Sequence, residues 1–123
     1  MKYLLDSNII IYHLKGEPIA MGFIDNYFRN SCISFITVIE VLSFNHSEQE
    51  AVLIKKLLST FVKLNVNDEL IEKTVILRKN SKIKLPDCII AATAINNNLT
   101  LVTRNCEDFK HFEGLKILNP FSA

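Results

Sequence analysis

The sequence predicts an α/β protein in which a small parallel sheet is covered by helices on both faces. The chain has 123 residues, 49% of them hydrophobic, so it is long and apolar enough to form a core. Short apolar segments alternate along it with segments of helical periodicity, which is the order expected for a parallel α/β sheet. No internal repeat or low-complexity stretch is present, so we expect residues 1–123 to form a single domain.

Short apolar segments are predicted to be strands and periodic segments to be helices. The predicted strands are residues 2–5, 31–35, 61–64, 99–102 and 116–118. The predicted helices are residues 7–14, 19–29, 37–43 and 48–59, a helix capped by Asn67 or Asp68, residues 87–96, and a short turn or helix at 105–109.

Several of these boundaries carry their own sequence signals. Gly16 and Pro18 end the first helix. Ser47 with Glu50 three residues later matches a capping box, and Pro86 suits a first helical turn. In the helix after Asn67, the residues predicted to face the core are Leu70, Ile71, Thr74, Val75 and Leu77.

Composition narrows the class of protein. The net charge of +1 does not by itself indicate a nucleic-acid binder, so any basic surface must come from local clustering. Cys32, Cys88 and Cys106 are odd in number and widely spaced, which argues against disulfides and structural zinc. No secretory pattern opens the sequence and no apolar run is long enough to span a membrane, so we expect a reduced, cytoplasmic protein.

Three acids lie in unusually apolar surroundings. Asp6 separates two aliphatic runs, Glu40 is the one charged residue between Arg29 and Glu48, and Asp87 opens a strongly apolar helix. An ionised carboxylate removed from water costs several kcal/mol unless it is paired or binds a metal. No Lys or Arg lies within these apolar segments, so a shared divalent cation such as Mg²⁺ or Mn²⁺ would best offset the cost.

Each acid also has a simpler interpretation. Asp6 could only cap the helix that follows it, Glu40 could sit at a solvent-facing notch, and Asp87 could only be an acid at a helix start. The placement of Asp6 favours a shared metal site, because Asp6 follows the carboxyl end of the first strand and ligands of parallel sheets bind beyond such ends.

Four blocks of the sequence together form a recognisable pattern. They are Leu4-Leu5-Asp6-Ser7-Asn8-Ile9, Ser34-Phe35-Ile36-Thr37-Val38-Ile39-Glu40, residues 85–94 around Pro86-Asp87, and residues 101–109 around Thr103-Arg104-Asn105. They span Leu4 to Phe109, almost the whole chain. In content and order these blocks resemble those of PIN-domain nucleases, and the short length resembles their VapC-like toxins.

The resemblance implies both an architecture and an activity. It implies a three-layer α/β/α sandwich with a small, mostly parallel sheet, often a homodimer. It also implies an endoribonuclease that cuts single-stranded regions of RNA, such as transfer RNA, with water activated by Mg²⁺ or Mn²⁺. Asp6, Glu40 and Asp87 carry over as catalytic metal ligands. VapC-like toxins are held inactive by a small cognate antitoxin, which would be a second partner.

The fourth block departs from the family pattern. Asn105 stands where the family often has Asp, and Asp108 follows three residues later, either as a further metal ligand or as a turn cap. Thr103 and Ser7 either lend hydroxyl groups to the acids or cap their turns. Asn8 is expected to order the first turn and to contact substrate.

Basic residues near these blocks suggest where RNA lies. Arg78, Lys79, Lys82 and Lys84 precede Asp87 and form either a phosphate-binding loop or a solvated linker. Arg104 either holds a phosphate or pairs with an acid, and Tyr12 either stacks on a base or packs in the core.

Two other functions remain open on sequence grounds. A catalytically weak or inactive PIN-fold module that binds RNA or a partner protein is favoured by the neutral Asn105 and opposed by the three acids. A receiver-like phosphoryl-transfer domain would need a second acid beside Asp6, and Ser7-Asn8 supplies none.

Overall fold

A computed structural model describes residues 1–122 and has one sheet of five parallel strands. The strand order is β3-β2-β1-β4-β5, and every pair of neighbours is parallel. The strands are β1 (Tyr3–Leu5), β2 (Ser31–Ser34), β3 (Val62–Leu64), β4 (Thr100–Val102) and β5 (Lys116–Leu118). The predicted parallel α/β sheet is therefore confirmed.

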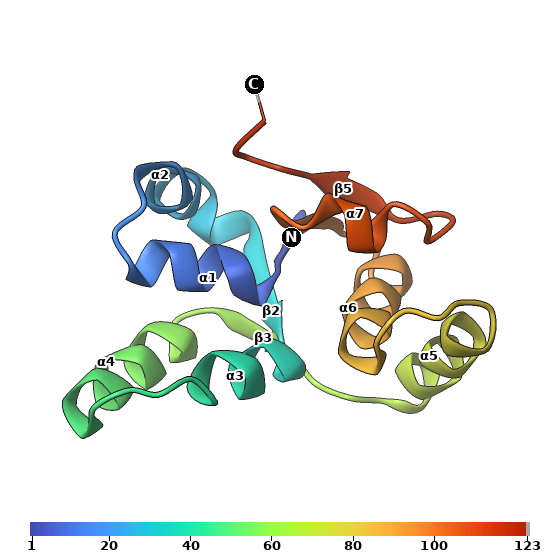
Figure 1. Cartoon of the computed structure of the whole chain (residues 1–123), viewed down its shortest axis with the longest axis horizontal. Coiled ribbons are helices and arrows are strands. Elements are labelled where there is room, and N and C mark those ends of the chain that lie inside the picture. Colours follow the sequence, from blue (N-terminus) through green and yellow to red (C-terminus); the bar gives the residue numbers. More distant parts are fainter. Residues whose placement is uncertain (123) are drawn as a thin grey trace.

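Helices cover both faces of this sheet (Figure 1). They are α1 (Ser7–Leu14), α2 (Pro18–Tyr27), α3 (Phe35–Leu42), α4 (Glu48–Ser59), α5 (Asp68–Lys79), α6 (Leu85–Asn96), the one-turn α7 (Cys106–Phe109) and a 3-10 turn, η1 (Phe28–Asn30). Figure 1 shows α1 to α4 on one side of the strands and α5 to α7 on the other.

The core consists of two apolar clusters, one on each face of the sheet. Side chains of β1 alternate between them: Tyr3 and Leu5 pack with α1 to α4, and Leu4 packs with α6 and α7. This alternation is the period-two pattern of a strand buried on both faces.

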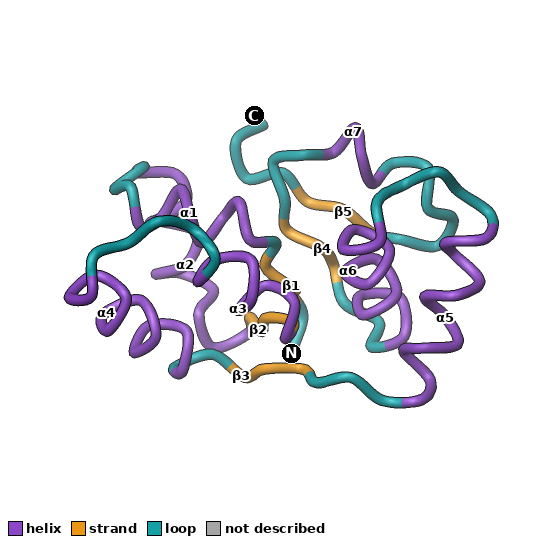
Figure 2. Tube along the Cα trace, turned by 60° about the horizontal axis from the view of Figure 1, so that its bottom comes forward, coloured by secondary structure: helices purple, strands orange, loops and turns teal. Residues whose placement is uncertain are grey.

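The strand order reverses at β1, the central strand of the sheet. The chain leaves β1 toward β2 and β3, then returns to β4 on the other side of β1 (Figure 2). The backbone N–H of Asp6, directly after β1, donates to the carbonyl of Val102 at the end of β4, at 2.9 Å. Ligands of parallel sheets bind beyond strand ends at such a reversal.

Most predicted boundaries agree with the structure to within two residues. The capping box is present: the backbone N–H of Glu50 donates to Ser47 Oγ at 3.1 Å, and that of Ser47 donates to Glu50 Oε1 at 3.0 Å. α3 begins at Phe35 instead of residue 37 because Ser34 Oγ caps it by accepting from the backbone N–H of Ile36.

One prediction about α5 is wrong. Ile71 and Val75, expected to face the core, are 52% and 46% exposed, because α5 packs on α6 through its other face, which carries Leu70 and Thr74. Cys32 and Cys88 are buried, whereas Cys106 is only partly buried. Within residues 1–122, no helix is long and apolar enough to cross a membrane.

Candidate active site

Asp6 is a buried acid at the junction of β1 and α1. Its side chain caps α1: Oδ1 accepts from the backbone N–H of Ser7 at 2.9 Å. Its other oxygen, Oδ2, accepts from Thr103 Oγ1 at 2.9 Å and from Asn8 Nδ2 at 3.3 Å. Burial raises the pKa of this carboxyl, although the bonds from Thr103 and Ser7 oppose the rise. The cap is therefore real, but it occupies only one carboxylate oxygen.

Glu40 reaches the same region from α3. Ser7 Oγ donates to Glu40 Oε1 at 3.3 Å, so Ser7 touches Asp6 through its backbone and Glu40 through its hydroxyl. Burial raises the pKa of Glu40, and the negative charges of Asp6 and Asp87 raise it further.

Asp87 lies in the first turn of α6, behind Pro86. Burial raises its pKa from 3.8 to about 6, the charges of Asp6 and Asp108 add to the rise, and Lys84 opposes it. Asp6 raises the pKa of both Glu40 and Asp87, and Asp87 raises that of Glu40, so the three carboxyl groups lie in one region of the molecule. The structure thus brings together three acids that lie 34 and 47 positions apart, from residue 6 to residue 40 and from residue 40 to residue 87.

Asp108, on α7, lies in the same region. Its negative charge raises the pKa of both Asp6 and Asp87. Its Oδ2 accepts from Asn105 Nδ2 at 2.6 Å, so the neutral Asn105 orients a fourth acid instead of replacing one. The backbone N–H of Asn105 also donates to Thr103 Oγ1 at 3.0 Å, which ties this turn to Asp6.

Among residues 1–122, no Lys, Arg or His forms an ion pair with these acids, although the charge of Lys84 partly offsets that of Asp87. In the part of the chain that the structure describes, the one ion pair within 4.0 Å joins Lys110 to Glu107. Across residues 1–122, no three His, Cys, Asp or Glu side chains are close enough to form a ready-made metal cage. Facing carboxylates with raised pKa values and no counter-ion fit a hard divalent cation that keeps several of its waters, as Mg²⁺ does.

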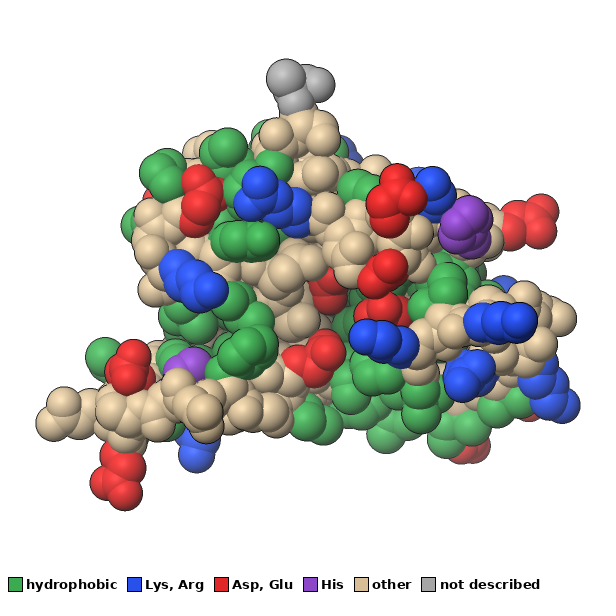
Figure 3. Space-filling model, viewed as in Figure 1, with side chains coloured by type: hydrophobic (Ala, Val, Ile, Leu, Met, Phe, Trp, Pro, Cys, Tyr) green, Lys and Arg blue, Asp and Glu red, His purple; other side chains and the backbone are tan. Residues whose placement is uncertain are grey.

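A cavity of about 290 Å³ adjoins the acids and carries part of the predicted basic loop. It is lined by Lys82, Ile83, Lys84, Asp87, Glu107, Asp108 and His111. Arg78 and Lys79 lie instead in the last turn of α5, and Arg78 Nη1 donates to the carbonyl of Ser81 at 3.4 Å. Figure 3 shows a group of acidic side chains at the centre of one face, with Lys and Arg side chains on either side of it.

Sequence reasoning missed two residues of this region. His111 lines the cavity beside Asp87, and only its position just after α7 could have indicated it. Phe121 lies against Tyr12, and the guanidinium of Arg104 lies over both rings. No short-range pattern links these three residues, because they come from α1, the turn after β4 and the C-terminal segment.

Comparison with known proteins places this fold and its group of acids in one protein family. The chain matches the PIN domain over residues 3–115 and therefore belongs to the PIN-domain family. Ribonuclease VapC2 of Haemophilus influenzae is 28% identical, with 97% of this chain and 98% of the relative aligned.

Solved structures of relatives superpose over nearly the whole chain. A chain of a toxin–antitoxin complex from Klebsiella pneumoniae is 34% identical, with a TM-score of 0.86 over 99% of this chain and 100% of that one. VapBC-1 of nontypeable Haemophilus influenzae is 27% identical, with a TM-score of 0.83 over 99% and 100% of the two chains. The resemblance drawn from the four sequence blocks is therefore confirmed.

Proposed function

We propose that this chain is a metal-dependent endoribonuclease, the toxin of a toxin–antitoxin pair, which cuts single-stranded regions of RNA. The observation that carries the proposal is the set of four acids, Asp6, Glu40, Asp87 and Asp108, which lie in one region and form no ion pair with a cation of residues 1–122. The relative from Haemophilus influenzae is a ribonuclease, and the relative from Klebsiella pneumoniae comes from a toxin–antitoxin complex. Both observations support this function.

Each acid has a role that follows from its contacts. Asp6, Glu40 and Asp87 would hold Mg²⁺ or Mn²⁺, which when bound lowers the pKa of water and stabilises charge on the scissile phosphate. Thr103 and Asn8 fix the carboxylate of Asp6, and Ser7 fixes that of Glu40.

Asp87 acts on the attacking water, and the two lysines of the adjoining cavity act on the substrate. Asp87 orients the attacking water, since its carboxylate lies in the first turn of α6, beside the cavity that Lys82 and Lys84 line. Lys82 and Lys84 attract RNA phosphates toward the acids that they adjoin.

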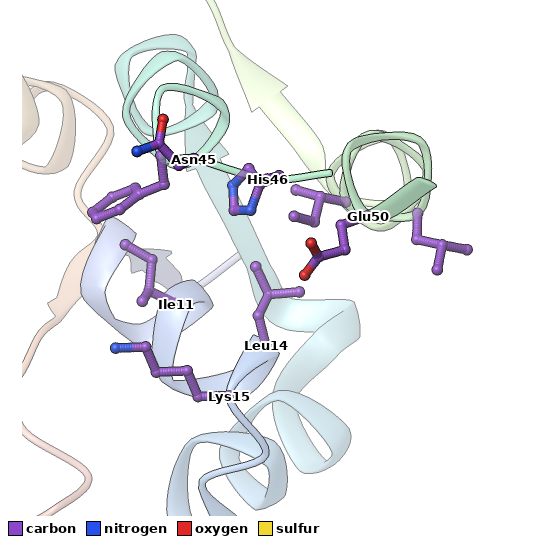
Figure 4. A pocket seen from close by; sticks show the side chains of 9 residues that line it. Ile11, Leu14, Lys15, Asn45, His46 and Glu50 are labelled. Carbon is purple, nitrogen blue, oxygen red and sulfur yellow. The ribbon is translucent and has the colours of Figure 1, made fainter. Parts of the chain in front are cut away.

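An antitoxin would bind at an apolar cleft on the α1 side of the molecule. This cleft of about 440 Å³ is lined by Ile11, Leu14, Lys15, Phe44, Asn45, His46, Glu50, Leu53 and Ile54 (Figure 4). Phe44 and Leu53 are largely exposed there, which is unusual for large apolar side chains without a partner. We assign the cleft to an apolar segment of the antitoxin.

A second copy of the chain would cover another apolar surface. Five exposed side chains lie on α3, the β3–α5 loop, α5 and the start of α6, namely Ile39, Val66, Ile71, Val75 and Leu85. A groove lined by Phe35, Val66, Leu70, Ile71, Thr74, Val75 and Ile89 runs between them. We assign this surface to the homodimer interface.

The test is cleavage of total RNA by the purified chain, free of antitoxin. We expect discrete cuts with Mg²⁺ or Mn²⁺, none with EDTA, and none from Asp6→Asn or Asp87→Asn. Asp25→Asn, which changes an exposed acid of α2, is the matched control and is expected to cut normally. Full activity of both site variants would refute the site. RNA or partner binding without cuts under any metal would instead identify a non-catalytic PIN-fold module.

A further inference from the structure

The side chain of Arg104 is held against two aromatic rings beside the acids. Its guanidinium carbon lies 5.1 Å from the ring centroid of Tyr12 and 4.3 Å from that of Phe121. The two rings are 5.3 Å apart and inclined by 57°. Tyr12 belongs to α1 and Phe121 to the C-terminal segment, so three distant parts of the chain meet at this cation.

Hydrogen bonds tie this arrangement to the acid site. The backbone N–H of Arg104 donates to Asn8 Oδ1 at 3.3 Å, and Asn8 Nδ2 donates to Asp6 Oδ2 at 3.3 Å. Arg104 also directly follows Thr103, whose hydroxyl donates to the same oxygen of Asp6. The position of Arg104 is therefore fixed relative to that of Asp6.

Among residues 1–122, no acid forms an ion pair with the guanidinium of Arg104. Arg104 is exposed, and the ion pair between Lys110 and Glu107 is the one found within 4.0 Å among residues 1–122. Aromatic rings hold a guanidinium by its face and leave the N–H groups at its edge free to donate. Those free donors match a phosphate, which accepts two parallel hydrogen bonds from arginine.

We propose that Tyr12 and Phe121 are positioning residues that hold Arg104 ready to bind a phosphate of single-stranded RNA. This inference rests on the proposed function, because it takes RNA as the substrate. Figure 1 shows α1, which carries Tyr12, on one side of the strands and the α5–α6 loop, which carries Lys82 and Lys84, on the other. The RNA backbone is thus held on both sides of the acids, and the C-terminal segment contributes to substrate binding.

The benefit of the two rings lies in pre-organisation. A long basic side chain loses rotamer freedom when it binds a ligand, and this loss weakens binding. Contacts with Tyr12 and Phe121 restrict Arg104 before RNA arrives, so less freedom is lost on binding. Removing the Phe121 ring should weaken RNA binding only while Arg104 is present.

The experiment measures binding of a labelled single-stranded oligouridylate by the full chain in EDTA, over a range of KCl concentrations. Arg104→Ala should weaken binding about tenfold and reduce the slope of log affinity against log salt by about 0.7. Phe121→Leu, which keeps apolar volume without a ring, should weaken binding about threefold. Phe121→Tyr should restore it.

A double variant separates positioning from a general effect on folding. Phe121→Leu should add nothing to Arg104→Ala if the ring acts through the arginine. Tyr27→Leu is the matched control, since Tyr27 also contacts two rings, those of Tyr3 and Phe23, but no arginine. Its RNA affinity should equal that of the wild type.

Four results would overturn the proposal. They are an unchanged salt slope in Arg104→Ala, wild-type binding by Phe121→Leu, a Phe121→Leu effect that persists without Arg104, and absence of RNA binding by the wild-type chain. Binding in EDTA requires no cleavage, so arginine-dependent binding without any nuclease activity would refute only the proposed function. Cleavage with an unchanged slope would refute only this inference.

Discussion

Thr103 Oγ1 donates a hydrogen bond to Asp6 Oδ2 at 2.9 Å, joining two residues 97 positions apart in the sequence. Both are buried, and the bond lowers the pKa of an acid that burial otherwise raises. Thr103→Val should therefore raise the pKa of Asp6, destabilise the metal-bound site and reduce cleavage at least about tenfold. The measurement is kcat together with the Mg²⁺ concentration that gives half the maximal rate.

Thr103→Ser is the control for this prediction because it keeps the hydroxyl group. It should retain most activity and need little more Mg²⁺ than the wild type. If Thr103→Val kept both values unchanged, the bond to Asp6 would have no part in catalysis.

The raised pKa of Asp87 predicts how pH affects stability without metal. A carboxyl whose pKa is higher in the folded than in the unfolded chain stabilises the fold most below its unfolded pKa. That contribution is lost between pH 3.8 and about 6, the ordinary and folded pKa values of Asp87. In EDTA, Asp87→Asn should therefore gain free energy of unfolding relative to the wild type as pH rises through this range.

Urea denaturation at several pH values measures this difference. Asp25→Asn, which changes an exposed acid, should show no such trend. A difference between Asp87→Asn and the wild type that stayed constant from pH 4 to 7 would contradict the proposed repulsion among the acids.

A bound divalent cation should offset the repulsion among the acids and stabilise the folded chain. Mg²⁺ or Mn²⁺ that binds only the folded chain raises the apparent stability by about 2.7 kcal/mol at a hundred times its Kd. The wild type should accordingly melt at a higher temperature with Mn²⁺ than with EDTA at pH 7, and Glu40→Gln should show a smaller rise. Equal melting temperatures with and without metal would show that the acids do not hold the ion.

The sequence predicted the elements of this fold because their signals are local. The Ser47–Glu50 capping box and the apolar strands can each be recognised from a few consecutive residues. Asp6, Glu40 and Asp87 could also be singled out, because an acid in an apolar segment is a local signal.

Contacts between distant segments could not be predicted in the same way. The bond from Ser7 to Glu40 and the packing of Phe121 on Tyr12 depend on how helices and the C-terminal segment meet. The outward orientation of Ile71 and Val75 depends likewise on which face of α5 packs on α6. Apolar periodicity cannot separate a core face from an interface, since both exclude water.

The structure divides the four basic residues before α6 into two pairs. Lys82 and Lys84 line the cavity beside Asp87, whereas Arg78 and Lys79 lie in the last turn of α5. Replacing Lys82 and Lys84 together with Ala should weaken RNA binding and lower the salt slope by about 1.4, about 0.7 for each lost phosphate contact. Replacing Arg78 and Lys79 should change both less. RNA titrations at several salt concentrations measure both quantities. If the two double variants lost affinity and salt slope equally, the cavity beside Asp87 would not be the place where RNA binds.

Ile71 and Val75 yield a prediction about assembly because they are exposed, apolar and one turn apart on α5. Ile71→Asp would place a charge in the centre of the proposed homodimer interface, where desolvation costs several kcal/mol. The variant should elute as a monomer in size-exclusion chromatography with light scattering, while its circular dichroism stays that of the wild type. Val52→Asp, at an exposed apolar position on α4 outside this surface, is the matched control and should remain dimeric. If the Ile71→Asp variant remained dimeric, the homodimer interface would lie elsewhere than on α5. The apolar face of α5 would then be available to a different partner.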